Sequence, residues 1–257
     1  MKKLLIGSAL LSSLLFAGGT ITPNMETSIE NTLVVEDSSS WNFEFSPYFA
    51  MTSISGTSAI GRAGESDLSL DFDQIVDALE FGISTHFEAQ HNSGWGLWLD
   101  YSYVSLGGSQ NTSIGNISVD IKQGIFEGLG MYRQNLSNGT IDYMAGVRSW
   151  RMKITTDVLT LRQIDETWID FIVGTRWTKS LNENWDFMLR GDIGTGDSDF
   201  TATAATGVRY HINEYLDLDI TYKALWVDYE TGTPNKINHF KYDTSTYGPI
   251  IGINFKF

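Results

Sequence analysis

The sequence contains no cysteine, only four prolines, and 17 lysine and arginine residues against 31 aspartate and glutamate residues. The absence of cysteine excludes disulfides, thiolate metal sites and a lipoprotein signal. The shortage of basic residues gives a formal net charge of −14 at pH 7, which excludes a phosphate-binding surface for nucleic acid. No apolar run reaches the roughly 20 residues that a helical membrane span requires.

Aromatic residues and glycine are abundant instead. Aromatic residues make up 13% of the chain, and it contains 25 glycines. This composition fits many strands joined by turns better than a helical bundle. A barrel with a polar interior would also keep the average hydropathy modest, because only every second residue of a strand would meet lipid.

The first 40 residues divide into two segments. Met1 to Lys3 is basic, residues 4–16 are apolar and residues 17–19 are small, which predicts a secretory signal peptide over residues 1–19 with cleavage after Gly19. Residues 20–40 are polar and predict a periplasmic leader with little structure of its own. The remaining residues, 41–257, have the length of a single domain.

The last eleven residues, 247–257, alternate between apolar side chains and small or polar ones. This period of two predicts a strand long enough to cross a bilayer when tilted. The ending resembles the closing strand of bacterial outer-membrane barrels. That resemblance implies that Gly252, Phe255 and Phe257 form the signal that the barrel-assembly machinery reads.

Alternation elsewhere predicts ten strands, or eight if the first or longest strand is misread. Tight turns alternate with long connections, as in transmembrane barrels with short periplasmic turns. The expected fold is all-β, an antiparallel up-and-down transmembrane β-barrel, with a bulge near Gly124 and an edge or bulge at Pro47. The expected strands span residues 41–51, 81–90, 95–104, 116–133, 140–154, 167–179, 185–193, 200–210, 215–227 and 247–257.

The first long connection has a helical pattern in its second half. Apolar residues recur at helical spacing between Asp71 and Glu80, and Asp71 followed by Gln74 matches a capping box. We therefore expect a short amphipathic helix in the first external loop.

Six short segments of the chain form a recognisable set: residues 71–79, 145–148, 172–176, 189–194, 206–210 and 220–224. Together they resemble a family of Gram-negative outer-membrane β-barrel proteins, small and porin-like, whose activities are largely unassigned. The resemblance implies a location in the cell outer membrane and a barrel fold, and it supplies no catalytic residues. The chain departs from the family pattern at Lys223, where an arginine is common.

The inward faces of the expected strands collect charges of both signs. A ten-stranded barrel is only slightly wider than one that side chains fill, so these charges are expected to pair and close the lumen. A narrow passive pore for small solutes or ions is the alternative. The expected network comprises Glu88, Asp100, Glu127, Arg148, Asp170, Arg176, Arg190, Asp192, Arg209 and Lys223.

An outer-membrane hydrolase is a further alternative, with Asp192, Asp197, Asp199 and His239 near the outer rim. No Ser/His/Asp order and no His-x-x-x-His spacing supports it, so neither an enzyme nor a cofactor is expected. Acidic pairs in the loops could hold Ca²⁺ or bridge lipopolysaccharide through divalent ions. Calcium takes six to eight oxygens and each pair offers fewer, so no metal site is expected. The pairs are Asp71 with Asp73, Asp197 with Asp199, and Asp228 with Glu230.

Four aromatic residues stand at the expected periplasmic starts of upward strands: Trp41, Trp95, Trp185 and Tyr215. Trp and Tyr prefer the membrane interface because the ring is apolar and its polar edge needs water. We expect them to form an aromatic girdle. The expected partners are outer-membrane lipid, lipopolysaccharide and the assembly machinery, and the expected role is structural or one of surface interaction.

Overall fold

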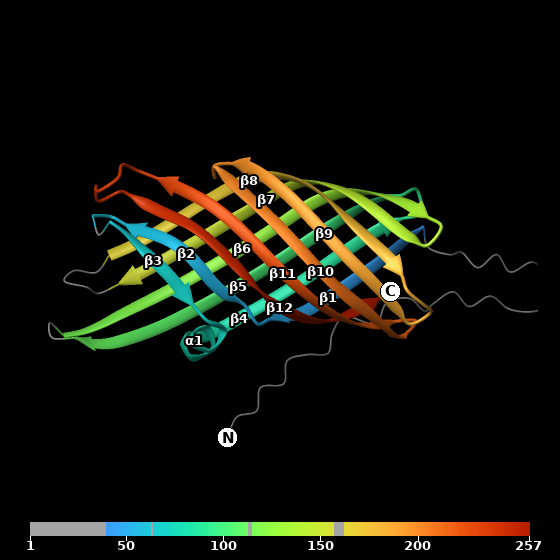
Figure 1. Ribbon diagram of the computed structural model, residues 1–257, viewed down its shortest axis with the longest axis horizontal. Coiled ribbons are helices and arrows are strands. Elements are labelled where there is room, and N and C mark those ends of the chain that lie inside the picture. The colour runs from blue at the N-terminus through green and yellow to red at the C-terminus, as the bar shows by residue number, and fades with distance from the viewer. Residues whose placement is uncertain (1–39, 63, 113–114, 157–161) are drawn as a thin grey trace, which may run out of the picture. The chain divides into compact units, whose positions relative to one another are not determined.

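The computed structural model describes residues 40–62, 64–112, 115–156 and 162–257. The expected signal peptide and all but the last residue of the expected leader lie outside these residues. The described chain forms a closed antiparallel barrel of ten strands, which confirms the predicted fold and strand count (Figure 1). The barrel strands are β1 (Trp41–Ala50), β4 (Leu79–His91), β5 (Trp95–Thr112), β6 (Gly115–Leu136), β7 (Gly139–Thr156), β8 (Arg162–Ser180), β9 (Trp185–Gly196), β10 (Phe200–Asn213), β11 (Leu216–Thr231) and β12 (Phe240–Lys256).

The barrel closes where β1 pairs with β12. The ladder runs from Glu44 opposite Lys256 to Ala50 opposite Ile250. At its end Phe43 N donates to Phe257 O at 3.0 Å, and Phe257 N donates to Phe43 O at 3.1 Å. No residue pair joins β1 to β12 at Ser46 and Pro47, and the register resumes unchanged above them, so Pro47 occupies a gap in this ladder and makes no bulge.

The first connection contains the expected helix and an additional hairpin. Helix α1 (Phe72–Ala78) confirms the prediction, and Gln74 Oε1 accepts a hydrogen bond from Asp71 N at 2.9 Å, as a capping box requires. The hairpin consists of β2 (Ser53–Ile60) and β3 (Glu65–Leu70), and β2 pairs with the outer half of β12. In Figure 1 β2 and β3 lie in the left half of the barrel and β1 in the right half, with α1 at the lower edge.

Three expected loops were wrong. Residues 106–112, 155–156, 228–231 and 240–243 continue the strands, so the hairpins β5–β6, β7–β8 and β11–β12 extend far beyond the predicted spans. A continued ladder satisfies backbone groups that a loop would leave to water. The expected bulge at Gly124 is also absent, because both of its ladders keep an even register; the shifts occur at Leu79/Phe81 and His211/Asn213 instead.

The interior of the outer half is apolar, which the sequence interpretation missed. Trp150 and Trp168 stack with ring centroids 5.4 Å apart, and Trp168 stacks on Tyr229 at 4.2 Å. All three rings are buried, and Phe240 and Tyr242 of β12 join the same cluster. The rings of this cluster pack inside the outer half of the barrel as side chains do in the core of a water-soluble protein.

The outward face carries the apolar residues that the alternation predicted. Phe171, Ile193 and Ile253 are exposed on three different strands, while the preceding residue of each, Asp170, Asp192 and Gly252, is buried. Lipid is the solvent that suits such a face. No helix among the described residues is long and apolar enough to cross a membrane.

Gly139 offers a test of the tight turn before β7. Its φ is +126°, and a Cβ there would lie 2.0 Å from Thr178 O. We expect Gly139→Ala to destabilise the barrel by about 1–3 kcal/mol, because a side chain is strained in this conformation and clashes with backbone. Urea titration in detergent, followed by the electrophoretic mobility of unboiled protein, measures the folded fraction. Gly130→Ala is the control, since its Cβ would meet Ala145 O at 3.8 Å; equal midpoints for the two variants would contradict the expectation.

Candidate functional site in the lumen

The centre of the lumen holds a buried charge cluster built from β6, β7 and β9. Arg148 Nη2 lies 2.9 Å from Glu127 Oε1 and 2.8 Å from Asp192 Oδ1. Arg190 Nη2 lies 2.8 Å from Glu127 Oε2 and 2.9 Å from Asp192 Oδ2. Each carboxylate is therefore shared by two guanidinium groups, and the side chains of Arg148 and Glu127 are 0% and 1% exposed.

Arg148 also reaches across the lumen to β10. Its Nη1 donates to Thr201 Oγ1 at 2.8 Å, and its Nη2 donates to Thr203 Oγ1 at 2.7 Å. Lys223 joins the cluster loosely, with Nζ 3.9 Å from Glu127 Oε1. Arginine suits this position because its planar fork can satisfy several acceptors at once, whereas lysine is a point charge.

A second cluster lies nearer the short turns. Arg176 donates to both oxygens of Glu88, at 2.7 and 2.9 Å, and to Asp142 Oδ2 at 2.6 Å. Arg133 contacts the same two carboxylates, at 3.0 Å from Glu88 and 2.7 Å from Asp142. Asp142 is fully buried, and two arginines compensate its charge.

Trp98 separates the two clusters. The guanidinium carbon of Arg176 lies 4.9 Å from the Trp98 ring centroid, and that of Arg190 lies 4.7 Å from it. Both distances fall in the cation–π range. The His86 ring packs on Trp98 at 3.8 Å, so the indole fills the space that the two arginine clusters leave.

A third charge cluster lies at the end of the barrel where β12 ends. Arg209 lies 2.9 Å from Glu44 and 2.7 Å from Asp219. Asp217 is fully buried, and its Oδ1 lies 2.8 Å from Lys256 Nζ and 2.9 Å from His211 Nδ1. These residues come from β1, β10, β11 and β12, so this cluster sits at the closure of the barrel.

Nine of the ten expected lumen residues take part in these contacts or lie beside them. Asp100 accepts a hydrogen bond from Tyr48 Oη at 2.9 Å and lies 3.8 Å from His86. Asp170 is the exception. It is opposite Arg148 in the β7–β8 register, but its Oδ1 accepts from Ser198 N at 2.9 Å, and its Oδ2 has no partner among the described residues.

Sequence reasoning omitted several members of the clusters. Arg133 and Asp142 share the inward face with Glu127 and Arg148, so the alternation could have identified them. Most of the others also alternate with outward residues, as His86 does on the same face as Glu88, so the alternation could have identified them too. The omitted residues are Glu44, His86, Arg133, Asp142, Asp186, His211, Asp217, Asp219 and Lys256.

The residues considered for hydrolysis are bound to separate partners. Asp192 is bound in the central cluster, and His239 Nε2 contacts Glu230 Oε1 at 2.9 Å. Asp197 Oδ2 accepts a hydrogen bond from Ile169 N at 2.9 Å, and Asp199 N donates to Asp228 O at 2.9 Å. Within the described chain, no group of three or more acidic, histidine or cysteine side chains is placed to hold a metal ion.

The expected interface aromatics stand at the starts of strands and are exposed. Trp95 is 63% exposed and packs its ring edge on Tyr132 at 5.2 Å, and Trp185 packs on Tyr210 at 4.8 Å. Trp41 and Tyr215 are exposed as well, as are Phe255 and Phe257 at the end of the chain. Gly252 is opposite Tyr48 in the closing ladder.

No protein-family model and no curated protein matches this chain. Solved structures do. The translocator domain of the autotransporter NalP from Neisseria meningitidis is 10% identical, with a TM-score of 0.50 over 87% of this chain and 90% of that one. The outer-membrane protease OmpT from Escherichia coli is 9% identical, with a TM-score of 0.52 over 84% of this chain and 96% of that one.

The fold is a closed antiparallel β-barrel like those of these two bacterial proteins. These likenesses bear on the fold alone, since one neighbour is a translocator domain and the other a protease. The outer-membrane barrel predicted from the sequence agrees with the closed ladder, the apolar outward face and these neighbours.

Removing Arg148 tests the central cluster. Arg148→Ala leaves Glu127 and Asp192 buried with only Arg190 and the distant Lys223 to compensate them. We expect a loss of about 3–5 kcal/mol in the free energy of unfolding, as for other broken buried pairs. Urea midpoints in detergent measure it. Arg151→Ala is the matched control, because Arg151 pairs with Asp165 at the exposed outer rim and its loss should lower the urea midpoint only slightly.

Two carboxyl groups at the outer rim have pKa values that are shifted in opposite directions, so replacing them should change the stability of the barrel with opposite signs. Partial burial, with the nearby carboxylates of Asp243 and Asp199, raises the pKa of Asp228 above its usual value. A hydrogen bond from Arg151 lowers the pKa of Asp165. The raised pKa means that ionised Asp228 opposes folding once the pH exceeds that pKa, while ionised Asp165 supports folding until the pH falls through its lowered pKa.

Asp228→Asn should therefore raise the urea midpoint at pH 7, and Asp165→Asn should lower it slightly. The Asp228 difference should vanish near pH 3, where that carboxyl group is mostly protonated in the unfolded chain as well as in the folded one. The Asp165 difference should disappear only at lower pH, as the pH falls through the lowered pKa of Asp165 in the folded barrel. Shifts of the same sign at pH 7 would contradict the assignment.

Proposed function

We propose that this protein is an integral outer-membrane barrel whose lumen is filled by its own side chains, and that it acts through its membrane-embedded body and outer surface. The observation that carries the proposal is the burial of Arg148 and Glu127, 0% and 1% exposed, at the centre of the barrel. A continuous water path would leave such side chains accessible.

The charges in the central cluster compensate one another without mobile ions. Glu127 and Asp192 each contact two arginines, and the hydroxyl group of Thr201 accepts a further hydrogen bond from Arg148. An ion entering the lumen would have to break these short charge-assisted bonds in a region that excludes water. The apolar cluster around Trp168 in the outer half would oppose an ion for a second reason, since it offers no polar ligand.

A narrow pore remains the second candidate because the outer half contains a cavity of about 220 Å³. Its lining includes Asp100 and Lys223, which belong to the charge clusters at its inner end. The cavity therefore ends on the network, which supports the filled-lumen proposal over the pore.

The outer surface is the part left for interaction with other molecules. Strands β5 to β8 and β11 to β12 continue well past the belt of exposed apolar residues, so the barrel presents folded hairpins outside the membrane. We extend the proposal to outer-membrane lipid and lipopolysaccharide as the immediate surroundings. The aromatic girdle at Trp41, Trp95, Trp185 and Tyr215, and the assembly signal at Gly252, Phe255 and Phe257, belong to the same proposal.

Planar-bilayer recording of the purified barrel tests the filled lumen. We expect no steady conductance steps from the native protein. The double variant Arg148→Ala/Arg190→Ala, if its gel mobility shows a folded barrel, should produce small, flickering events, because it removes two guanidinium groups from the central cluster. Arg151→Ala is the control and should remain silent. Large, steady channels from the native barrel would refute the proposal.

A further inference from the structure

The barrel wall is incomplete on one side of its outer half. The ladder between β1 and β4 ends where Pro47 is opposite Thr85. Above that point, residues 79–84 of β4 pair with β5 on one edge and with no described strand on the other. Strand β3, which ends the sheet on the far side of this break, pairs only with β2. A seam thus separates β4 from β1 and β3.

Helix α1 crosses this seam, since it connects β3 to β4. It turns Phe72, Ile75 and Val76 towards the cavity, yet none of its residues is buried, and Val76 is 43% exposed. The Phe72 ring meets Phe49 edge-on at 6.4 Å. The helix is therefore a lightly packed cover, and its apolar face is only partly removed from solvent or lipid.

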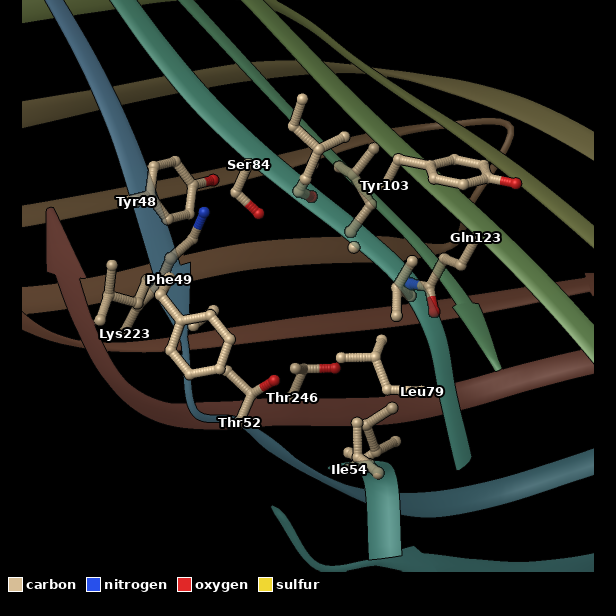
Figure 2. A pocket seen from close by; sticks show the side chains of 18 of the residues that line it. Tyr48, Phe49, Thr52, Ile54, Leu79, Ser84, Tyr103, Gln123, Lys223 and Thr246 are labelled. Carbon is tan, nitrogen blue, oxygen red and sulfur yellow. The ribbon is translucent and has the colours of Figure 1, made fainter. Parts of the chain in front are cut away.

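The cavity of about 220 Å³ lies beneath this cover and has two different ends (Figure 2). Tyr48, Ser84 and Lys223 gather at the inner end, next to the charge network. Apolar side chains form much of the remaining lining, among them Ile54, Leu79, Leu106, Ile125 and Leu225. A cavity of this size is smaller than the roughly 300–1,000 Å³ that enclose a drug-sized ligand, so it suits one end of a longer molecule.

Lys223 supplies the charge that selects the ligand. Both oxygens of Glu127 are already taken at 2.8–3.0 Å by Arg148 and Arg190, and Lys223 Nζ stands 3.9 Å from that carboxylate. Its ammonium group has three hydrogen-bond donors, and this distant contact leaves donors available at the inner end of the cavity. An anionic group arriving there would gain a charge-assisted hydrogen bond.

We propose that the seam is a lateral entry for a single-chain anionic amphiphile of the fatty-acid class. The carboxylate lies at Lys223, the first part of the chain lies against the apolar walls beneath α1, and the rest extends through the seam into the outer leaflet. Gly82 leaves space on the β4 side of this path, since a Cβ there would meet nothing closer than 3.6 Å. The ligand would not need to cross the lumen, because the network forms the floor of the cavity.

Binding of radiolabelled palmitate to the full barrel in phospholipid nanodiscs, corrected for empty nanodiscs, tests this proposal. We expect saturable binding of about one molecule per barrel, with Lys223→Met weakening it about tenfold or more, as expected for one lost charge-assisted bond. Gly82→Leu should abolish binding by filling the path. Lys241→Met, which removes a cation paired with Glu65 at the outer rim, is the matched control and should bind as the native protein does.

Two further ligands separate the contributions of the head group and the chain in the native protein. Hexadecanol has the same chain without the charge and should bind about tenfold more weakly, with no further loss in Lys223→Met. Lysophosphatidylglycerol presents a larger head group and should bind more weakly than palmitate. Gel mobility confirms that each variant is folded. The proposal is overturned by an absence of saturable binding, by palmitate binding unchanged in both cavity variants, by an equal loss in Lys241→Met, or by lysophosphatidylglycerol binding as tightly as palmitate.

Discussion

The hydrogen bonds that join β1 to β12 are the constraint on which the rest of this structure depends. Within a bilayer every backbone N–H and C=O must be satisfied by the protein itself, and a sheet achieves this only when its first and last strands meet. Phe43 and Phe257 complete that ring with two reciprocal bonds. Ten strands then fix the circumference, and a lumen of this width leaves little room for water beside large side chains.

The narrow lumen explains why its arginines and carboxylates are shared rather than paired one to one. Glu127 and Asp192 are each held by Arg148 and Arg190, and a similar sharing links Arg176 and Arg133 to their two carboxylates. A buried charge is tolerated only when its hydrogen-bonding capacity is used, and sharing uses it on both sides. The apolar outer half needs no such compensation, so the two halves are filled by different chemistry.

The pairing of β1 with β12 also determines how the outer half of the barrel wall is built. Strand β12 is longer than β1, so its outer half pairs with β2 instead, and β3 ends the sheet without reaching β4. The wall is continuous at the base and interrupted above Thr85. Helix α1 and the cavity under it lie at that interruption, so this cavity is at the side of the barrel and not at its open end.

The sequence alone determined the ten barrel strands, because the alternation of side chains is a local property with a period of two, but it did not indicate the hairpin of β2 and β3. It therefore predicted the barrel, its ten strands, the helix at residues 71–80 and the inward face of most charged residues. It could not tell a Gly- and Ser-rich loop from a continued hairpin such as β5–β6, since that choice depends on the partner strand. Tertiary structure alone decided which charges meet: Asp170 is opposite Arg148 in the ladder, yet Arg148 turns to Asp192 and Thr201 across the lumen. Those distances exist only once the ring has closed, because closure, and not spacing along the chain, brings distant strands face to face.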